Sequence, residues 1–170
     1  MVKHEEKRVM IFVDGSNLFW GCDRFGKRNR IPHFRIDPFK LIPFLTDNRD
    51  FIRAHWYVST TTPPLIKQSN FYDYLEKNGI VVTKKPLVKG KEKGVDVALV
   101  TDLLCSGFNR CYDVGIIFSG DRDLCSAYDE IRRLGLTIEV VAFQGDYNSI
   151  ILKHCDRFID IDKYASNLKN

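Results

Sequence analysis

The chain has 170 residues, of which 44% are hydrophobic and 28% are charged, a composition that excludes disordered and fibrous proteins. Its apolar runs fall far short of the roughly 20 residues of a membrane span, and its charged residues 1–7 are unlike a signal peptide. With a net charge of +4, the sequence predicts a soluble, cytoplasmic protein that is not attached to a membrane.

Short runs rich in Val, Ile and Phe recur along the chain and predict β-strands. They occupy residues 9–13, 51–58, 80–82, 114–118 and 137–143, and residues 158–159 could add a short sixth strand. Such continuous apolar character is typical of strands that are covered on both faces, as in a parallel sheet.

Helical patterns separate these strands. Asp37 is expected to cap a short helix over residues 38–45, with Pro38 at its first position. A second helix is expected to end at Asn78-Gly79, a third to cover residues 95–105 and stop before Gly107, and a fourth to place residues 124–134 before Gly135. The alternation of strands and helices predicts a three-layer α/β/α sandwich with right-handed crossovers.

Positive charge is concentrated in two segments. Residues 24–35 carry +5 and residues 84–93 carry +4, so the rest of the chain is net negative. Basic segments on an acidic body are typical of proteins that bind a polyanion. Two solvated charged loops are an equally good explanation.

Aspartates follow the predicted strand ends. Asp14 comes directly after the first strand, Asp121 comes shortly after the fourth, and Asp96 opens the helix that follows the third. The carboxyl ends of parallel strands share one edge of a sheet, where α/β proteins place their sites, so we expect these carboxylates to lie together. Each aspartate alone is better explained as a helix cap, and only their occurrence together favours a functional site.

Carboxylates gathered at this edge would repel one another by roughly 4 kcal/mol for a pair 4 Å apart at an effective dielectric near 20. A bound cation would offset this repulsion. The five cysteines form no C-x-x-C pair, and an all-oxygen ligand set favours Mg²⁺ or Mn²⁺ over zinc. Such ions activate water and neutralise charge on phosphate oxygens, so the pattern indicates phosphodiester hydrolysis.

The chain contains, in this order, FVDGSNL at residues 12–18, KEKGVDVALVTDLL at residues 91–104 and FSGDRDL at residues 118–124. Together these blocks resemble the NYN domain family (DUF88, or LabA-like), a branch of the PIN-like nuclease superfamily. The resemblance extends over about residues 9–161. It implies a single domain in residues 1–170, a PIN-like parallel sheet in the order 3-2-1-4-5, and metal-dependent ribonuclease activity.

The resemblance also implies roles for matching residues. Asp14, Asp96 and Asp121 correspond to catalytic carboxylates that hold the metal ion, Mg²⁺ or Mn²⁺. Asn17 would orient water or substrate. Asp123 matches a further catalytic aspartate, or it only caps a helix.

Three residues are expected to support these ligands rather than touch the metal. Asp102 lies six residues after Asp96, about 240° around a helix, so the two cannot share one face. Ser119 would hold a water. Lys93 would pair with Asp96 or contact a phosphate.

RNA, single-stranded rather than duplex, is the expected partner. The third strand should exit at the acidic edge, so the basic segment that follows it would reach a bound strand. The residues expected to contact RNA are Lys84, Lys85, Lys89, Lys91 and Arg122. The stretch from Arg24 to Arg35 matches no motif, and pairing of two chains through exposed aromatic residues stays open.

The main alternative is a non-catalytic module of the same fold that binds RNA or another protein. Capping alone would be satisfied by Ser, Thr or Asn, so the aspartates favour the enzyme. A haloacid-dehalogenase-type phosphatase would need a second acid where Ser16 stands. A dinucleotide-binding domain would need a G-x-G-x-x-G motif, which does not follow Val13.

Overall fold

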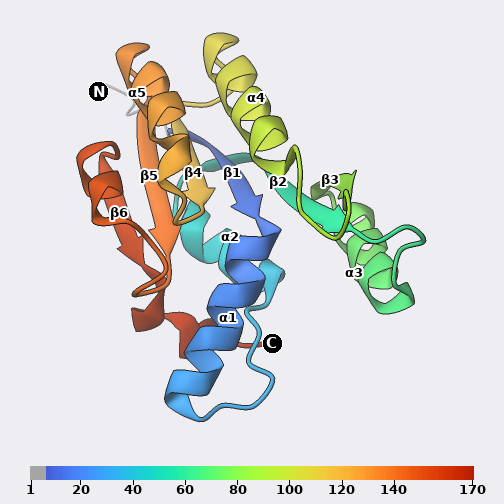
Figure 1. The fold of residues 1–170 in the computed structure, drawn as a ribbon. Helices are drawn as coiled ribbons and strands as arrows, with labels where there is room; N and C mark the ends of the chain where they lie inside the picture. The colour runs from blue at the N-terminus through green and yellow to red at the C-terminus, as the bar shows by residue number, and fades with distance from the viewer. Residues whose placement is uncertain (1–6) are drawn as a thin grey trace.

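A six-stranded parallel sheet forms the centre of the protein, in the order β3-β2-β1-β4-β5-β6 (Figure 1). The structure is a computed structural model that describes residues 7–170. Residues 1–6, which contributed to the expectation of no signal peptide, lie outside the described part. The predicted strand order and the short sixth strand are confirmed.

The six strands overlap the predicted runs. They are β1 (Arg8–Asp14), β2 (Asp50–Thr60), β3 (Val81–Pro86), β4 (Val114–Phe118), β5 (Thr137–Ala142) and β6 (Arg157–Asp160). The prediction ended β3 at residue 82, but the strand continues to Pro86. This strand lies at the edge of the sheet and no residue in it is fully buried, so its second half carries no apolar signal.

Helices cover both faces of the sheet, which confirms the three-layer sandwich. Helices α1 (Gly15–Asn29), α2 (Pro38–Thr46) and α3 (Ile66–Lys77) contribute to one hydrophobic core, and α4 (Val95–Phe108) and α5 (Cys125–Arg133) contribute to the other. Val9, Ile11 and Val13 of β1 pack in the first core, whereas Met10 and Phe12 pack in the second. This alternation is the two-residue period of a strand that is buried on both sides.

Helix α4 extends past Gly107, where the sequence predicted an end. A Cβ atom at Gly107 would lie 2.3 Å from Cδ1 of Ile131 in α5. Glycine is therefore required here by the close approach of the two helices, which lie side by side in Figure 1. It does not terminate α4.

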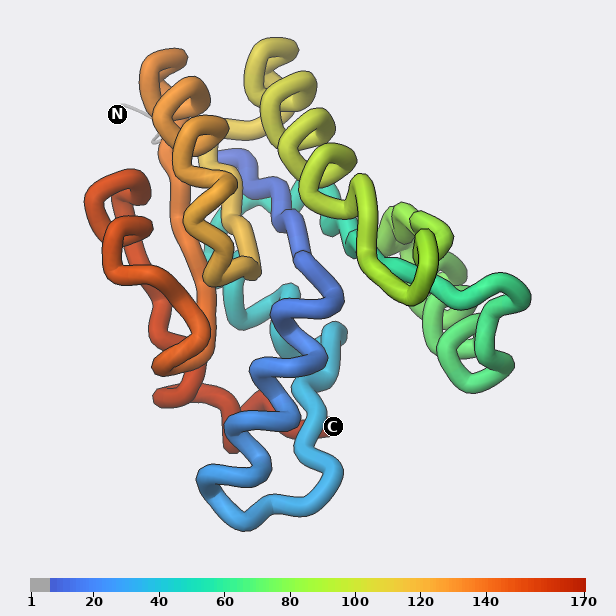
Figure 2. The backbone as a smooth tube through the Cα atoms, viewed as in Figure 1, coloured from blue at the N-terminus to red at the C-terminus, as the bar shows by residue number. Residues whose placement is uncertain are grey.

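The chain passes from β1 directly into α1 (Figure 2). Helix α1 extends beyond the carboxyl edge of the sheet, and residues 31–37 then return toward α2. The first turn of α1 thus lies at the predicted site, while its last turn lies far from it. Among residues 7–170, no helix combines the length and the apolar character that a membrane crossing requires.

Candidate functional site: an acidic cluster at the carboxyl edge of the sheet

Asp14 ends β1 and caps α1. Its Oδ1 accepts hydrogen bonds from the backbone N–H groups of Ser16 (3.0 Å) and Asn17 (3.1 Å), and its Oδ2 accepts one from the Asn17 side-chain amide (2.6 Å). The residue is only 4% exposed. Burial raises the pKa of Asp14 to about 6; the hydrogen bonds from Asn17 oppose this shift, and the charges of Asp96 and Glu92 add to it.

Asn17 and Ser119 connect the end of β1 to the end of β4. Asn17 donates to Asp14 and accepts a hydrogen bond from the backbone N–H of Gly120 (3.2 Å) through Oδ1. The buried Ser119 hydroxyl donates to Asp14 Oδ2 at 3.5 Å and accepts from the backbone N–H of Asp121 at 3.2 Å. These bonds fix the segment that carries Asp121 relative to Asp14.

Asp121, Asp123 and Asp96 complete the predicted set. Asp121 caps a short 3-10 helix, η1 (Arg122–Leu124), by accepting a hydrogen bond from the backbone N–H of Asp123 (2.9 Å). Asp96 lies in the first turn of α4, and burial together with the charges of Asp121, Glu92 and Asp123 raises its pKa. The Asp123 side chain is 82% exposed. The structure thus brings the predicted carboxylates within electrostatic reach of one another.

Glu92 belongs to this cluster, although the sequence did not single it out. It accepts a hydrogen bond from the Ser16 hydroxyl, and its charge raises the pKa of both Asp14 and Asp96. Its place four residues before Asp96 in the second sequence block was the available signal. Because lysines flank it on both sides, it had the pattern of a solvated charged loop.

Asp146 reaches the same edge from the segment that follows β5. A Cβ atom at Gly120 would lie 1.9 Å from the Asp146 carbonyl oxygen, so only glycine permits this approach. The Asp146 carboxylate pairs with Arg24 at 2.6 Å, and its buried Oδ2 has no hydrogen-bond partner among the described residues. No motif in the sequence marks Asp146.

We expect Gly120→Ala to destabilise the protein by about 1–3 kcal/mol, the usual cost of overpacking a tight site. The added methyl group must displace either residues 119–121 or the Asp146 backbone, and both lie at the acidic cluster. Urea unfolding would measure the change. An unchanged free energy of unfolding would contradict the close approach of these two segments.

The acidic cluster suits a hard divalent cation. No Lys, Arg or His among residues 7–170 forms an ion pair with Asp14, Asp96 or Asp121. Within the same part of the chain, no three Asp, Glu, His or Cys side chains are close enough to hold an ion alone. Mg²⁺ usually takes only one or two carboxylates, and waters and substrate phosphates complete its shell, so this ligand set fits.

Two of the residues expected to support the ligands, Asp102 within α4 and Lys93 just before it, do not contact Asp14, Asp96 or Asp121. Asp102 accepts a hydrogen bond from the Tyr57 hydroxyl (2.9 Å) and lies 3.8 Å from His55. Lys93 is exposed, and among the ion pairs of the described residues none joins it to Asp96. The suggested pair of Lys93 with Asp96 is therefore wrong for this structure.

The lysines of β3 point to opposite faces of the sheet. Lys84 pairs with Glu76 (3.1 Å) and Asp73 (3.7 Å) of α3. Lys85 instead lines a shallow groove beside α4 together with Lys93. Lys89 and Lys91 are exposed in the loop before α4, and Arg122 is exposed next to Asp121. The lysines therefore do not form one continuous basic surface.

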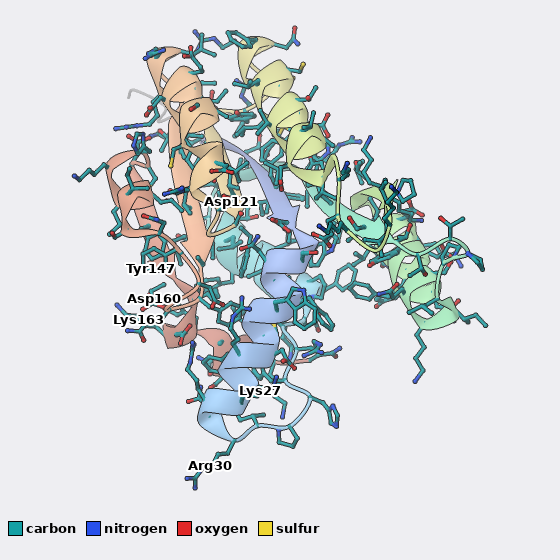
Figure 3. The ribbon with its side chains drawn as sticks, viewed as in Figure 1. Lys27, Arg30, Asp121, Tyr147, Asp160 and Lys163 are labelled. Atoms are coloured by element: carbon teal, nitrogen blue, oxygen red, sulfur yellow. The ribbon has the colours of Figure 1, made fainter. Side chains whose placement is uncertain are left out.

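Much of the positive charge in residues 24–35 is neutralised within the fold. Arg24 pairs with Asp146, Lys27 with Asp23 at 2.7 Å, and Arg28 with Asp162 at 2.7 Å. Figure 3 places Lys27 and Arg30 at the far end of α1 from Asp121. Most of this segment therefore extends away from the acidic cluster. Arg35, at its end, lies nearer, because it lines the same cavity as Gly15 and Ser16 at the start of α1.

The raised pKa of Asp14 predicts that, without divalent cations, stability falls as pH rises from about 4 to 6. The folded chain binds this proton more tightly than the unfolded chain, where the pKa is near 3.8, so protonation favours folding. The loss amounts to about 3 kcal/mol. Urea unfolding in EDTA across this range would show a steeper fall for the wild type than for Asp14→Asn, and equal slopes would contradict the shift.

Comparisons with known proteins agree on one family and one fold. A family model described as the NYN domain matches residues 8–162. The chain is 26% identical to the low amplitude and bright protein LabA of Synechococcus elongatus, over 94% of this chain and 86% of the relative. A crystal structure of a protein of unknown function from Vibrio parahaemolyticus has the same fold, with a TM-score of 0.79, 20% identity and full coverage of both chains.

Proposed function

Because the chain belongs to the NYN domain family, a family of PIN-like nucleases, we propose that it is a divalent-metal-dependent ribonuclease that hydrolyses phosphodiester bonds. The observation that carries this proposal is the acidic cluster at the carboxyl edge of the sheet. Asp14 and Asp96 both have raised pKa values there, partly because the neighbouring carboxylates repel their charge. A divalent cation would relieve that repulsion, and bound divalent ions promote phosphodiester hydrolysis by activating water and stabilising charge on the phosphate.

In the proposed reaction, Asp14, Asp96 and Asp121 would hold the ion directly or through waters, and the substrate phosphate would complete its shell. When bound, Mg²⁺ or Mn²⁺ would supply an activated water and stabilise negative charge on the phosphate. Asn17 acts by positioning, because both ends of its amide are engaged with Asp14 and Gly120. The Asp123 carboxylate is largely exposed, so it can accept a proton from water or bind the ion from the solvent side of the cluster.

The basic side chains nearest the cluster would hold the phosphates of single-stranded RNA. Lys85 and Lys93 approach the start of α4, where Asp96 lies, and Arg122 follows Asp121 in the chain. Lys89 and Lys91 extend from the loop that also carries Glu92. Lys84 is expected to contribute least, because its charge is already paired with Glu76 and Asp73. Ser119 supports the site through its hydrogen bonds with Asp14 and Asp121. Asp102 would act only indirectly, through helix α4, whose first turn carries Asp96.

Cleavage of an end-labelled single-stranded RNA by the purified chain tests this function. We expect products with Mn²⁺ or Mg²⁺ and none with EDTA. Binding of the same RNA without cleavage under any divalent ion would favour the non-catalytic binding module and overturn the nuclease.

A further inference from the structure

A cavity of about 520 Å³ opens beside the acidic cluster, between α1, β2 and α3. Aromatic side chains from all three elements line it: Phe19 and Trp20 of α1, Trp56 of β2, and Phe71 and Tyr72 of α3. Trp56 and Tyr72 are buried, whereas Trp20 is 55% and Phe71 is 39% exposed. We call this cavity the aromatic groove. The exposed parts of Trp20 and Phe71 are available to a flat ligand.

Polar and positively charged groups also reach the aromatic groove. The Arg35 guanidinium lies 4.2 Å from the centre of the Phe19 ring, and Lys67 extends from the first turn of α3. The Ser59 hydroxyl lines the groove and is buried without a hydrogen-bond partner among the described residues. Gln68 adds an amide that can both donate and accept. The groove thus offers stacking surfaces, phosphate-binding cations and hydrogen-bonding groups together.

The aromatic groove is continuous with the acidic cluster. Ser16 and Glu92 line the groove, and the two side chains are joined by a hydrogen bond. The charge of Glu92 acts on Asp14 and Asp96 on one side and on the Tyr72 phenol on the other. A chain-like ligand held at the acidic cluster would therefore continue into the groove.

We propose that the aromatic groove binds unpaired nucleobases of the RNA strand whose phosphate lies at the acidic cluster, an inference that rests on the proposed function. Any nucleobase can stack on an aromatic side chain, which gives affinity with little sequence preference. Arg35 and Lys67 would contact the flanking phosphates, and Ser59 and Gln68 would contact base edges.

This occupant predicts a preference for single strands, because the bases of a duplex are stacked inside it and cannot enter a groove. A second copy of the chain fits the aromatic groove less well than RNA does. It would have to bury the charges of Arg35 and Lys67 beside the aromatic residues, and such burial is costly without partners.

Binding of two oligonucleotides in EDTA tests the proposal separately from catalysis. One is fluorescently labelled hexauridylate, and the other is an abasic ribose-phosphate chain of the same length and charge. The wild type should bind hexauridylate at least about tenfold more tightly, given the usual contribution of one stacked base. The two tryptophans of the chain, Trp20 and Trp56, both line the groove, so hexauridylate should also quench intrinsic fluorescence.

Two variants remove aromatic side chains that are partly exposed in the groove. Trp20→Ala and Phe71→Ala should each weaken hexauridylate binding by about tenfold and leave binding of the abasic chain unchanged. Phe108→Ala is the matched control, since Phe108 is 59% exposed at the opposite end of α4 from Asp96 and does not line the groove. It should bind both probes like the wild type.

The possible failures are distinguishable. Equal affinity of the wild type for both probes, or unchanged hexauridylate binding by both variants, would overturn base binding even if the chain cleaves RNA. If Trp20→Ala instead converts a dimer to a monomer in sedimentation experiments with RNA binding intact, the groove joins two copies and the proposal is wrong. If no RNA is cleaved with Mn²⁺ but Phe71→Ala abolishes the preference for hexauridylate over the abasic chain, base binding in the groove is supported and the proposed ribonuclease activity is wrong.

Discussion

Asp121→Asn should reduce the rate of RNA cleavage by 100-fold or more, a rise of about 3 kcal/mol in the barrier, in saturating Mn²⁺. The amide keeps the shape of the side chain and can still accept the hydrogen bond from the Asp123 backbone, so the fold should survive. What it removes is one negative charge at the acidic cluster. RNA affinity should stay the same or rise, because the phosphates meet less repulsion.

Asp160→Asn is the matched control for this variant. Asp160 ends β6 and caps the short helix η3 (Ile161–Lys163) by accepting a hydrogen bond from the Asp162 backbone, as Asp121 does for η1. Figure 3 shows the two aspartates on separate segments. If Asp160→Asn slows cleavage as much as Asp121→Asn, a general effect of replacing a capping aspartate explains both results and the catalytic role of Asp121 is wrong.

Divalent cations should stabilise the wild-type protein strongly. An ion that binds only the folded chain, present at 100 times its dissociation constant, adds about 2.7 kcal/mol to the free energy of unfolding. For a chain of this size that corresponds to a rise in melting temperature of about 5–10 °C. Thermal unfolding with Mn²⁺ or Mg²⁺, against EDTA, measures the shift.

The double variant Asp96→Asn/Asp121→Asn should lose this stabilisation almost completely, while Asp160→Asn should keep it. In EDTA the double variant should be at least as stable as the wild type, because two repelling charges are gone. If the ion raises the melting temperature of the double variant as much as that of the wild type, the metal ion binds somewhere other than the acidic cluster.

The fold was predictable from sequence because most strands are buried on both faces. Their Val, Ile and Phe runs give a strong signal, and β4 begins and ends where its run does. The second half of β3 gave no such signal because its lysines alternate between the two faces of an edge strand that is only partly buried. Gly107 led to a wrong prediction of the end of α4. Glycine is needed there because α4 and α5 pack closely, and this contact is visible only in the folded structure.

The site was partly predictable for a related reason. Asp14 and Asp121 follow strand ends, and parallel topology alone brings such positions to one edge. Glu92 and Asp146 come from loops, whose paths depend on particular contacts such as that of Asp146 with Gly120. The charge of residues 24–35 was misleading as well, because its partners, Asp146 and Asp162, lie more than 100 residues away in sequence.

The central claim, that the acidic cluster is a metal centre for phosphodiester hydrolysis, is tested most directly by the anomalous scattering of Mn²⁺. Crystals of the protein soaked in Mn²⁺ should show an anomalous peak that contacts at least two of Asp14, Asp96 and Asp121, directly or through one water. A map with Mn²⁺ bound elsewhere, or with no peak within reach of these carboxylates, would contradict the account.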